Sequence, residues 1–299
     1  MKKVILILTS DPFSINFEIL KKSQNFLKKK LKNRYLIIGD REEISTYIGK
    51  NNKLINYLNI KRKKNTKLYL KECFNLAFDL VKKKKAHGII NLPLNKRFLP
   101  GSYPGFTEYA ADAFNKRGKE TMLLYNQNFS VCPNTTHIMI KDVSRSLTKK
   151  KIITNINNIS NFYKNIIGIK KPTIGVMGLN PHNGMDFKKR IEEKDTINPA
   201  IKKLIKDKIK VIGPLVPDVA FNEINKKKIN CLVGHYHDQV LPTFKYIHKF
   251  DAINITLGLP FLRISPDHGT ASNLKNKNLA NPESFIAALK FFEKHYKKI

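Results

Sequence analysis

The chain has 299 residues, more than one hydrophobic core comfortably organises, so we expect two domains. Apolar residues make up 41% of the sequence, which suits a globular fold, and no run approaches the roughly 20 apolar residues of a membrane span. The net charge of +33 lies in many short lysine runs without a zinc-finger, RNP or leucine-zipper pattern, so we expect a basic surface that attracts anionic substrates and no nucleic-acid partner.

The N-terminal part alternates predicted strands with predicted helices. Residues 1–10 combine a basic start with an apolar run that is too short for a signal sequence, so they are expected to contain the first strand. Apolar spacing predicts strands at 3–8, 35–39 and 88–92, and helices at 17–31, 41–47 (capped by Asp40) and 68–84. This alternation predicts a largely parallel α/β sheet, in which ligands gather at the carboxyl ends of the strands.

A polar loop follows strand 88–92 and ends in Phe106-Thr107-Glu108. Thr107 is a candidate cap for a helix at 109–116, and it is an equally good candidate for ligand contact. The two roles are compatible, because a helix N-terminus also binds phosphate.

The middle of the chain continues the alternation. Strands are predicted at 121–125, 129–132, 173–179 and 229–233, and helices at 146–167 and 199–206 (capped by Asn198). A loop is predicted at 213–218, and a short helix or a turn at 222–227. One histidine follows each of three strands: His137, His182 and His237. A single such histidine is usually structural, but three neutral imidazoles would bind a divalent metal and polarise a substrate oxygen. Their spacing matches no local metal motif.

The densest group of polar residues lies at 234–270. Predicted strands at 253–257 and 261–264 carry Asn254 and Arg263, and burying an amide or a guanidinium is costly unless it is paired. Pro242 is predicted to begin a helix that runs to residue 248 and carries Lys245, and a closing helix is predicted at 282–297. This density of polar groups indicates a binding or catalytic site.

The three cysteines, Cys73, Cys132 and Cys231, are scattered and form no CxxC pair. Such cysteine usage is typical of a reducing compartment, so we expect a cytoplasmic protein. We expect no membrane partner.

A series of short motifs resembles the 4-hydroxythreonine-4-phosphate dehydrogenase family of vitamin B6 biosynthesis. The motifs are Thr135-Thr136-His137, Gly178-Leu179-Asn180-Pro181-His182, Glu192-Glu193 with Asp195-Thr196-Ile197, Gly213-Pro214-Leu215, Tyr236-His237-Asp238-Gln239, residues 254–261, and Asp267-His268-Gly269-Thr270-Ala271. The resemblance covers most of the chain and is strongest from Gly178 onward. So many matches in the same order are far more specific than one short pattern.

The resemblance implies an α/β fold like isocitrate and isopropylmalate dehydrogenases, with two domains and a central cleft. The first domain would comprise 1–105 and 265–299, and the second, 106–264, would carry the metal ligands and the dimer contacts. The family works as a homodimer with the active site at the interface. It oxidises 4-phosphooxy-L-threonine with NAD or NADP, and the product then loses CO2 to give 3-amino-2-oxopropyl phosphate.

The resemblance also implies roles for single residues. It places one divalent ion (Zn, Co, Mn or Mg) on His137, His182 and His237, and substrate contacts on Thr107, Lys245, Asn254 and Arg263. Lys245 and Arg263 would neutralise phosphate or carboxylate. Lys245, Asp267 and His268 are the candidate catalytic residues. Asp267 and His268 would transfer protons, or else make a structural hydrogen bond, and Asp238 is a candidate to orient a ligand histidine.

The chain departs from the family pattern at three places. Phe106 stands where the family usually has a histidine that also touches substrate. Residues 10–18 replace a glycine-rich segment, and residues 185–190 replace the glycine-rich loop after the second metal histidine. Two alternatives therefore stay open: a related dehydrogenase for another phosphorylated hydroxy acid, and a non-catalytic basic binding protein. The histidines and the Lys245, Asn254 and Arg263 set argue against the second alternative.

Overall fold

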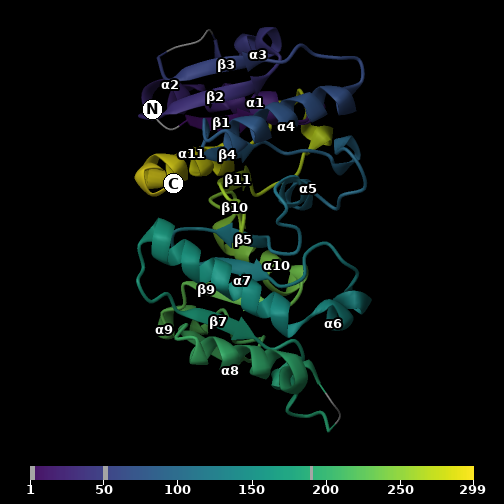
Figure 1. Ribbon diagram of the computed structural model, residues 1–299, viewed down its shortest axis with the longest axis vertical. Helices are drawn as coiled ribbons and strands as arrows, with labels where there is room; N and C mark the ends of the chain where they lie inside the picture. The colour runs from purple at the N-terminus through teal and green to yellow at the C-terminus, as the bar shows by residue number, and fades with distance from the viewer. Residues whose placement is uncertain (1–3, 50–52, 189–190) are drawn as a thin grey trace. The chain divides into compact units, whose positions relative to one another are not determined.

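The computed structural model describes residues 4–49, 53–188 and 191–299 (Figure 1). Lys3, Lys189 and Arg190, which belong to predicted segments, lie outside the described residues. The chain forms two compact units, of which unit 1 comprises Met1–Arg117, Phe250–Ile255 and Leu259–Ile299, and unit 2 comprises Gly118–Lys249 and Thr256–Gly258. Among the described residues, no helix has the length and apolar character needed to cross a membrane.

Unit 1 is built on a parallel sheet. Its strands run in the order β3 (Ile55–Asn59), β2 (Arg34–Gly39), β1 (Val4–Leu8), β4 (Gly88–Asn91) and β11 (Leu262–Pro266), each parallel to its neighbours. β10 (Ile253–Leu257) begins in unit 1 and ends in unit 2. β1 is almost entirely buried, which explains its continuous apolar sequence; β4 is fully buried as well, although it ends in the polar Asn91.

The helices of unit 1 are α1 (Asn16–Lys22), α2 (Gln24–Lys29), α3 (Arg41–Ile48), α4 (Thr66–Lys82), α5 (Phe106–Ala113) and α11 (Glu283–His295). The apolar face of α4, with Leu70, Phe74 and Ala77, packs on β1 and β2 (Figure 1). Asp40 caps α3 as predicted, since its carboxylate accepts hydrogen bonds from the first-turn N–H groups of Glu42 and Glu43.

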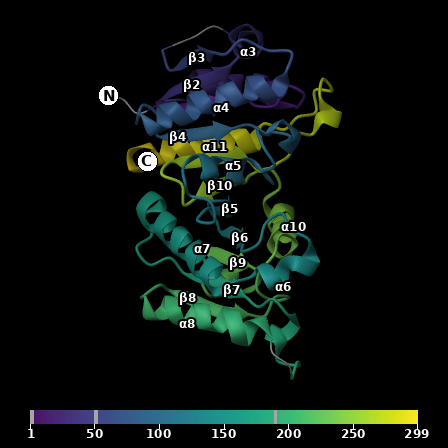
Figure 2. The same cartoon turned by 45° about the vertical axis from the view of Figure 1, so that its right-hand side comes forward.

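Unit 2 contains a second sheet segment in the order β5 (Thr121–Tyr125), β6 (Ser130–Pro133), β9 (Cys231–Gly234), β7 (Ile174–Met177) and β8 (Val211–Leu215). Only the β5–β6 pair is antiparallel among these described strands. The helices are α6 (Val143–Ser146), α7 (Lys149–Phe162), α8 (Asn198–Lys206), α9 (Glu223–Lys226) and α10 (His237–His248). Figure 2 shows α7 and α10 on opposite sides of β6 and β9.

Several predicted elements were wrong in their bounds. The predicted helix at 17–31 is two helices, because the chain turns at the buried Ser23. Strand β3 was not predicted, since it lies at the sheet edge and only Ile55 of its residues is buried. Asn198 is the first residue of α8 and not its cap, because the π-helix Glu193–Ile197 runs directly into α8.

Two elements that contain a proline were predicted wrongly. Pro214 lies in β8, where a loop was predicted; β8 is an edge strand, and an edge strand tolerates a residue without an N–H. α10 begins at His237, although Pro242 was predicted as its first residue. The first turn is anchored by Gln239, whose side chain accepts from the N–H of His235 at 2.6 Å and donates to the carbonyl of Gly178 at 2.8 Å.

Thr107 was also predicted wrongly as a cap. α5 begins at Phe106 after Gly105, which has no side chain to cap it, so Thr107 lies inside the first turn.

The predicted domains were 1–105 with 265–299, and 106–264. The compact units have boundaries of their own, with Phe106 and Arg263 in unit 1 because both pack among its strands and helices.

Candidate functional site

The three candidate metal-ligating histidines follow three neighbouring strands of unit 2. His137 follows β6, His182 lies in the 3-10 helix Pro181–Gly184 after β7, and His237 begins α10 after β9. β6 and β7 each pair with β9 in parallel. The carboxyl ends of these strands therefore share one edge of the sheet, the position at which parallel α/β sheets gather their ligands.

The structure brings two of the three histidines together. The ring centroids of His137 and His237 lie 5.7 Å apart, with 44° between the ring planes. Over residues 4–49, 53–188 and 191–299, no group of three or more His, Cys, Asp or Glu side chains is arranged to hold a metal ion. The predicted site of three histidines, which includes His182, therefore stays a prediction.

Carboxylates orient two of the histidines. Nδ1 of His237 lies 2.7 Å from Oδ1 of Asp238, and Nδ1 of His182 lies 2.8 Å from Oδ2 of Asp186. The hydrogen bond and the charge of Asp186 raise the pKa of His182. A carboxylate on Nδ1 is the arrangement in which Nε2 binds a metal. Asp238 was a candidate for this contact, whereas Asp186 was missed because it lies in the segment that departs from the family pattern.

A buried carboxylate holds the start of the loop that carries His182. Glu193 is 1% exposed, and its Oε1 accepts from the main-chain N–H groups of Leu179 and Asn180, both at 2.8 Å. Its Oε2 accepts from Nδ2 of Asn180 at 2.9 Å. The hydrogen bonds that the carboxylate of Glu193 accepts offset the free-energy cost of burying its charge. The sequence pointed to Glu193 only as part of a motif, without a role.

The same loop has an unusual backbone. His182 and Asn183 have φ values of 50° and 56°, in the left-handed region that non-glycine residues rarely adopt. Such a conformation persists where surrounding contacts hold it. One such contact is the hydrogen bond from Nδ2 of Asn183 to the carbonyl of Pro214, at 2.9 Å.

His235 holds the segment that leads to His237 in place, and it was not identified from the sequence. It is fully buried; its Nε2 donates to the carbonyl of Met177 at 2.7 Å, and its Nδ1 accepts from Nδ2 of Asn134 at 3.2 Å. Burial lowers the pKa of His235 to about 4, so the imidazole is neutral at physiological pH. It thus links β7 to the segments that lead to His137 and His237.

Unit 1 contains the candidate anion-binding residue Arg263, on β11. Its side chain is 4% exposed; Nε donates to Oδ1 of Asn91, and Nη1 donates to Oγ1 of Thr107 at 3.3 Å. The guanidinium carbon lies 5.2 Å from the ring centroid of Phe106. Burial lowers the pKa of Arg263 to about 10, against the opposing charge of Glu108, and the group stays cationic at neutral pH. The structure therefore brings Thr107 and Arg263 together, and it adds Asn91, which no sequence signal marked.

The other candidate residues have distinct surroundings. Asn254, on β10, has a buried Oδ1 that accepts no hydrogen bond from any described residue. Lys245 is exposed on α10 of unit 2. The N–H of Asp267 donates to Oγ of Ser284 at 2.8 Å, and Nδ1 of His268 lies 2.9 Å from the carbonyl of the next residue.

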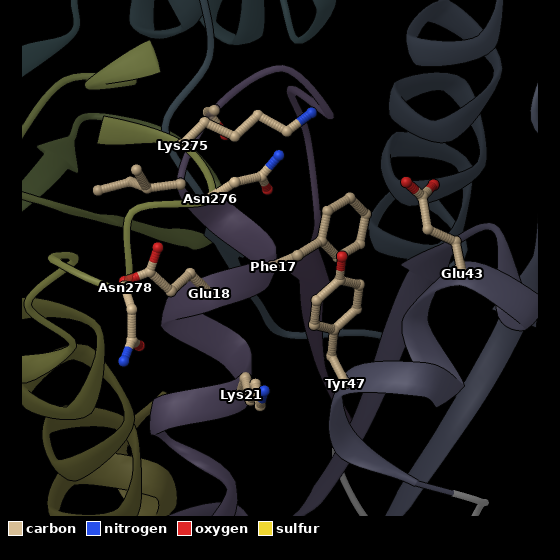
Figure 3. A pocket seen from close by; sticks show the side chains of 10 residues that line it. Phe17, Glu18, Lys21, Glu43, Tyr47, Lys275, Asn276 and Asn278 are labelled. Atoms are coloured by element: carbon tan, nitrogen blue, oxygen red, sulfur yellow. The ribbon is translucent and has the colours of Figure 1, made fainter. Parts of the chain in front are cut away.

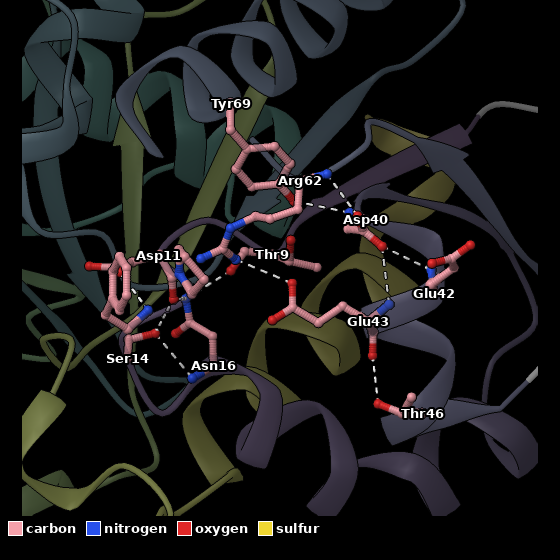
Figure 4. Close-up of polar contacts among 12 residues, drawn as sticks. Thr9, Asp11, Ser14, Asn16, Asp40, Glu42, Glu43, Thr46, Arg62 and Tyr69 are labelled. Atoms are coloured by element: carbon pink, nitrogen blue, oxygen red, sulfur yellow. Dashed lines mark hydrogen bonds and ion pairs between the residues drawn. The ribbon is translucent and has the colours of Figure 1, made fainter. Parts of the chain in front are cut away.

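Side-chain hydrogen bonds hold the segment after β1 (Figure 4). Ser10 adopts a φ of 56°, the left-handed conformation usual for glycine. Oδ2 of Asp11 accepts from the N–H of Asn95 at 3.2 Å, and Nδ2 of the fully buried Asn16 donates to the carbonyl of Pro93 at 2.8 Å. The segment is thereby tied to the loop that follows β4.

A pocket of about 340 Å³ lies beside this segment (Figure 3). It is lined by α1, α3 and the loop that follows β11. Phe17 and Tyr47 stack on one another there, with ring centroids 5.0 Å apart, and Lys21 and Lys275 supply positive charge. The carboxylates of Glu18 and Glu43 also line it. An apolar wall with charges of both signs suits part of a nucleotide, whose phosphates are anionic and whose ribose hydroxyls donate hydrogen bonds to carboxylates.

Comparisons with known proteins agree with this architecture. The sequence matches the family described as pyridoxal phosphate biosynthetic protein PdxA over residues 13–292. The 4-hydroxythreonine-4-phosphate dehydrogenase of Sulfurihydrogenibium sp. (strain YO3AOP1) is 36% identical over 314 residues, covering 95% of this chain and 96% of that protein. The structure of the 4-hydroxythreonine-4-phosphate dehydrogenase from Klebsiella pneumoniae superposes with a TM-score of 0.82 at 25% identity, covering 97% of this chain and 98% of that one.

A more distant structure shows the fold alone. Isocitrate dehydrogenase from Methylococcus capsulatus has a TM-score of 0.53 at 10% identity, over 97% of this chain and 85% of that one. The predicted α/β fold of the isocitrate dehydrogenase type is thus confirmed, and so is the predicted oxidoreductase class, which implies a nicotinamide cofactor. The chain belongs to the family of pyridoxal phosphate biosynthetic proteins PdxA, the 4-hydroxythreonine-4-phosphate dehydrogenases.

Proposed function

We propose that the chain oxidises 4-phosphooxy-L-threonine with NAD or NADP, and that the resulting β-keto acid loses CO2 to give 3-amino-2-oxopropyl phosphate. The observation that carries this proposal, beyond the family, is the buried guanidinium of Arg263 beside Thr107. A guanidinium suits phosphate or carboxylate because it donates hydrogen bonds from a planar fork. Both anionic groups are present on the proposed substrate.

Other residues are proposed to bind or to move protons. Asn254 would accept a hydrogen bond from the substrate, since its Oδ1 is buried and receives none from the described residues. Lys245 would neutralise phosphate or carboxylate as an exposed ammonium group. Asp267 and His268 would take part in proton transfer, with a purely structural role as the alternative for both.

We assign the divalent ion to His137, His182 and His237. The adjacent rings of His137 and His237, and the carboxylates on Nδ1 of His182 and His237, support this donor set. A divalent ion bound there would polarise a substrate oxygen. Imidazole donors suit Zn, Co or Mn, and Mg less well.

The proposed enzyme is a homodimer whose subunits share the active site. Large apolar side chains beside the candidate ligands are exposed: Met139 and Ile140 after His137, and Met185 after His182. In a homodimer, the subunit interface would cover such exposed apolar side chains beside functional residues. We place the protein in the cytoplasm, because its three cysteines are free and buried.

The nicotinamide cofactor is proposed to place its nucleotide part in the pocket of Figure 3. Lys21 and Lys275 would face its phosphates, and Phe17 with Tyr47 would form the apolar wall. The pocket lies at the loops that follow β1 and β11, where open α/β sheets bind ligands. Parallel assays with NAD+ and NADP+ decide which one is used.

The test is a turnover assay. Purified protein with a divalent metal, 4-phosphooxy-L-threonine and NAD+ or NADP+ should produce the absorbance of reduced nicotinamide. Turnover of another phosphorylated hydroxy acid, and none of this one, would favour the related dehydrogenase, which the replacement of a histidine by Phe106 supports. Salt-sensitive binding to duplex DNA without any turnover would favour the non-catalytic binding protein.

A further inference from the structure

Asn91 and Phe106 both contact Arg263 from elements that lie beside β11. In the sheet, Arg263 pairs with Ile89 of β4, and Asn91 lies two residues further along the same strand. Residues i and i+2 of a strand share one face, so Asn91 is the diagonal neighbour of Arg263 on that face. The arginine side chain therefore runs along the sheet towards Asn91, whose Oδ1 accepts from Nε.

The amide of Asn91 is itself fixed. Asn91 is 2% exposed, and its Nδ2 donates to the carbonyl of Leu92 at 3.3 Å. This contact turns Oδ1 towards Nε of Arg263, and a reversed amide would set two donors against one another. A single buried acceptor on Nε defines the direction in which the guanidinium plane points.

Phe106 provides a rigid face for the same group. Its ring is 7% exposed and packs edge-on against Phe74, with centroids 5.1 Å apart. Because the aromatic core holds this ring, the guanidinium of Arg263 has a fixed π surface at 5.2 Å. The hydroxyl of Thr107 accepts from Nη1 of Arg263 at 3.3 Å.

We infer that Asn91 and Phe106 are positioning residues that fix the plane of Arg263 for the anionic group of the substrate. The inference rests on the proposed function, in which Arg263 binds that group. The ring at position 106 supplies a cation–π contact that holds the arginine. A bidentate contact with an oxyanion depends on the orientation of the guanidinium, so loss of either support weakens substrate binding.

The binding experiment uses the full chain with its metal. Asn91→Ala should raise the Kd and KM for 4-phosphooxy-L-threonine by roughly 10- to 100-fold, because Nε loses a buried acceptor. Phe106→Leu, which keeps an apolar side chain without a π face, should raise both by roughly 2- to 30-fold. In each variant kcat should change by less than about threefold, since the lost contact holds substrate and transition state alike.

Phe78→Leu is the matched control. Phe78 belongs to the same aromatic core and is also buried, at 3% exposure, and the rings of Phe114 at 5.4 Å and Tyr109 at 5.7 Å lie closer to it than that of Phe106. The control variant should lose stability to a similar degree and bind substrate as the wild type does. Equal loss of affinity in Phe78→Leu and Phe106→Leu would overturn the inference, because the effect would then come from a loosened core.

A second readout needs no substrate. In protein labelled with 15N-arginine, the Nε–H signal of Arg263, assigned by its absence in Arg263→Lys, should exchange slowly with solvent and be shifted by the ring of Phe106. The slow exchange should disappear in Asn91→Ala, and the ring-induced shift should disappear in Phe106→Leu. Both should be retained in Phe78→Leu. A wild type that fails to oxidise 4-phosphooxy-L-threonine contradicts the proposed function alone. A signal that is unchanged in both test variants contradicts the positioning of Arg263.

Discussion

Removing the carboxylate of Glu193 should loosen the start of the loop that carries His182. In Glu193→Gln, Oε1 still accepts from the N–H groups of Leu179 and Asn180, but the new NH2 faces Nδ2 of Asn180, donor against donor. The loss of one charge-assisted bond costs about 1–3 kcal/mol. Glu193→Ala leaves two buried main-chain donors unsatisfied as well, so its cost should reach about 4 kcal/mol or more.

Hydrogen exchange measures this cost where it arises. The free energy of local opening is obtained from the exchange rates of the Leu179 and Asn180 amides, by mass spectrometry of a peptide that covers them. Each 1.4 kcal/mol corresponds to about a tenfold faster exchange. Exchange should therefore be roughly 10- to 100-fold faster in Glu193→Gln and faster still in Glu193→Ala. An unfolding midpoint would be less informative here, because it reports the unfolding of whole compact units and not the opening of one loop.

Glu192→Gln is the matched control. Oε2 of Glu192 accepts from the side chain of Asn180 at 2.9 Å, and Oε1 accepts from the hydroxyl of Ser144, but neither oxygen contacts the N–H of Leu179. The exchange of that amide should stay within about threefold of the wild type. If Glu193→Ala exchanges no faster than Glu192→Gln, the carboxylate of Glu193 does not hold this loop.

Three further predictions concern buried groups and the metal. Burial lowers the pKa of His235 to about 4, below the roughly 6.5 of an unfolded imidazole, so the unfolded state alone gains this proton as pH falls from about 6.5 towards 4. As the pH is lowered from about 6.5 to 4, the urea midpoint of the wild type should therefore decrease more than that of His235→Gln. Equal decreases in the two proteins would contradict the buried neutral imidazole. Burial raises the pKa of Cys73 and Cys231 to about 12 and that of Cys132 well above its usual value. A thiol reagent at pH 8 should therefore label none of the three quickly in the native protein and all of them in guanidinium. Rapid labelling of the native protein would refute this. His182→Ala should lose the bound divalent metal, as measured by metal content after gel filtration, and wild-type content would exclude His182 as a ligand.

Local features were the most predictable part of the fold. The cap of α3 was predicted because Asp40 bonds to residues only two and three positions away, within reach of a sequence pattern. The start of α10 was not, because the long-range hydrogen bond from Gln239 to Gly178 fixes its first turn. The sequence predicts a loop at Pro214, because its position at a sheet edge depends on the strand order, which no local pattern gives.

The candidate site divides in the same way. Polar residues in apolar strands, such as Arg263, and histidines after strands, such as His237, are visible in the sequence because they break an apolar pattern. Their supporting partners are not visible. Asn91 is 172 residues from Arg263 along the chain, and Met177 is 58 residues from His235, so only the folded sheet brings each pair together. A buried polar residue far along the chain gives no local sign of its partner.

The proposed reaction is tested most directly by its carbon balance. With 4-phosphooxy-L-threonine labelled with 13C at the carboxyl group, the enzyme should release one labelled CO2 for each reduced nicotinamide formed. Reduced nicotinamide without labelled CO2, or no reduction at all with metal and either cofactor present, would contradict the proposed oxidation and decarboxylation.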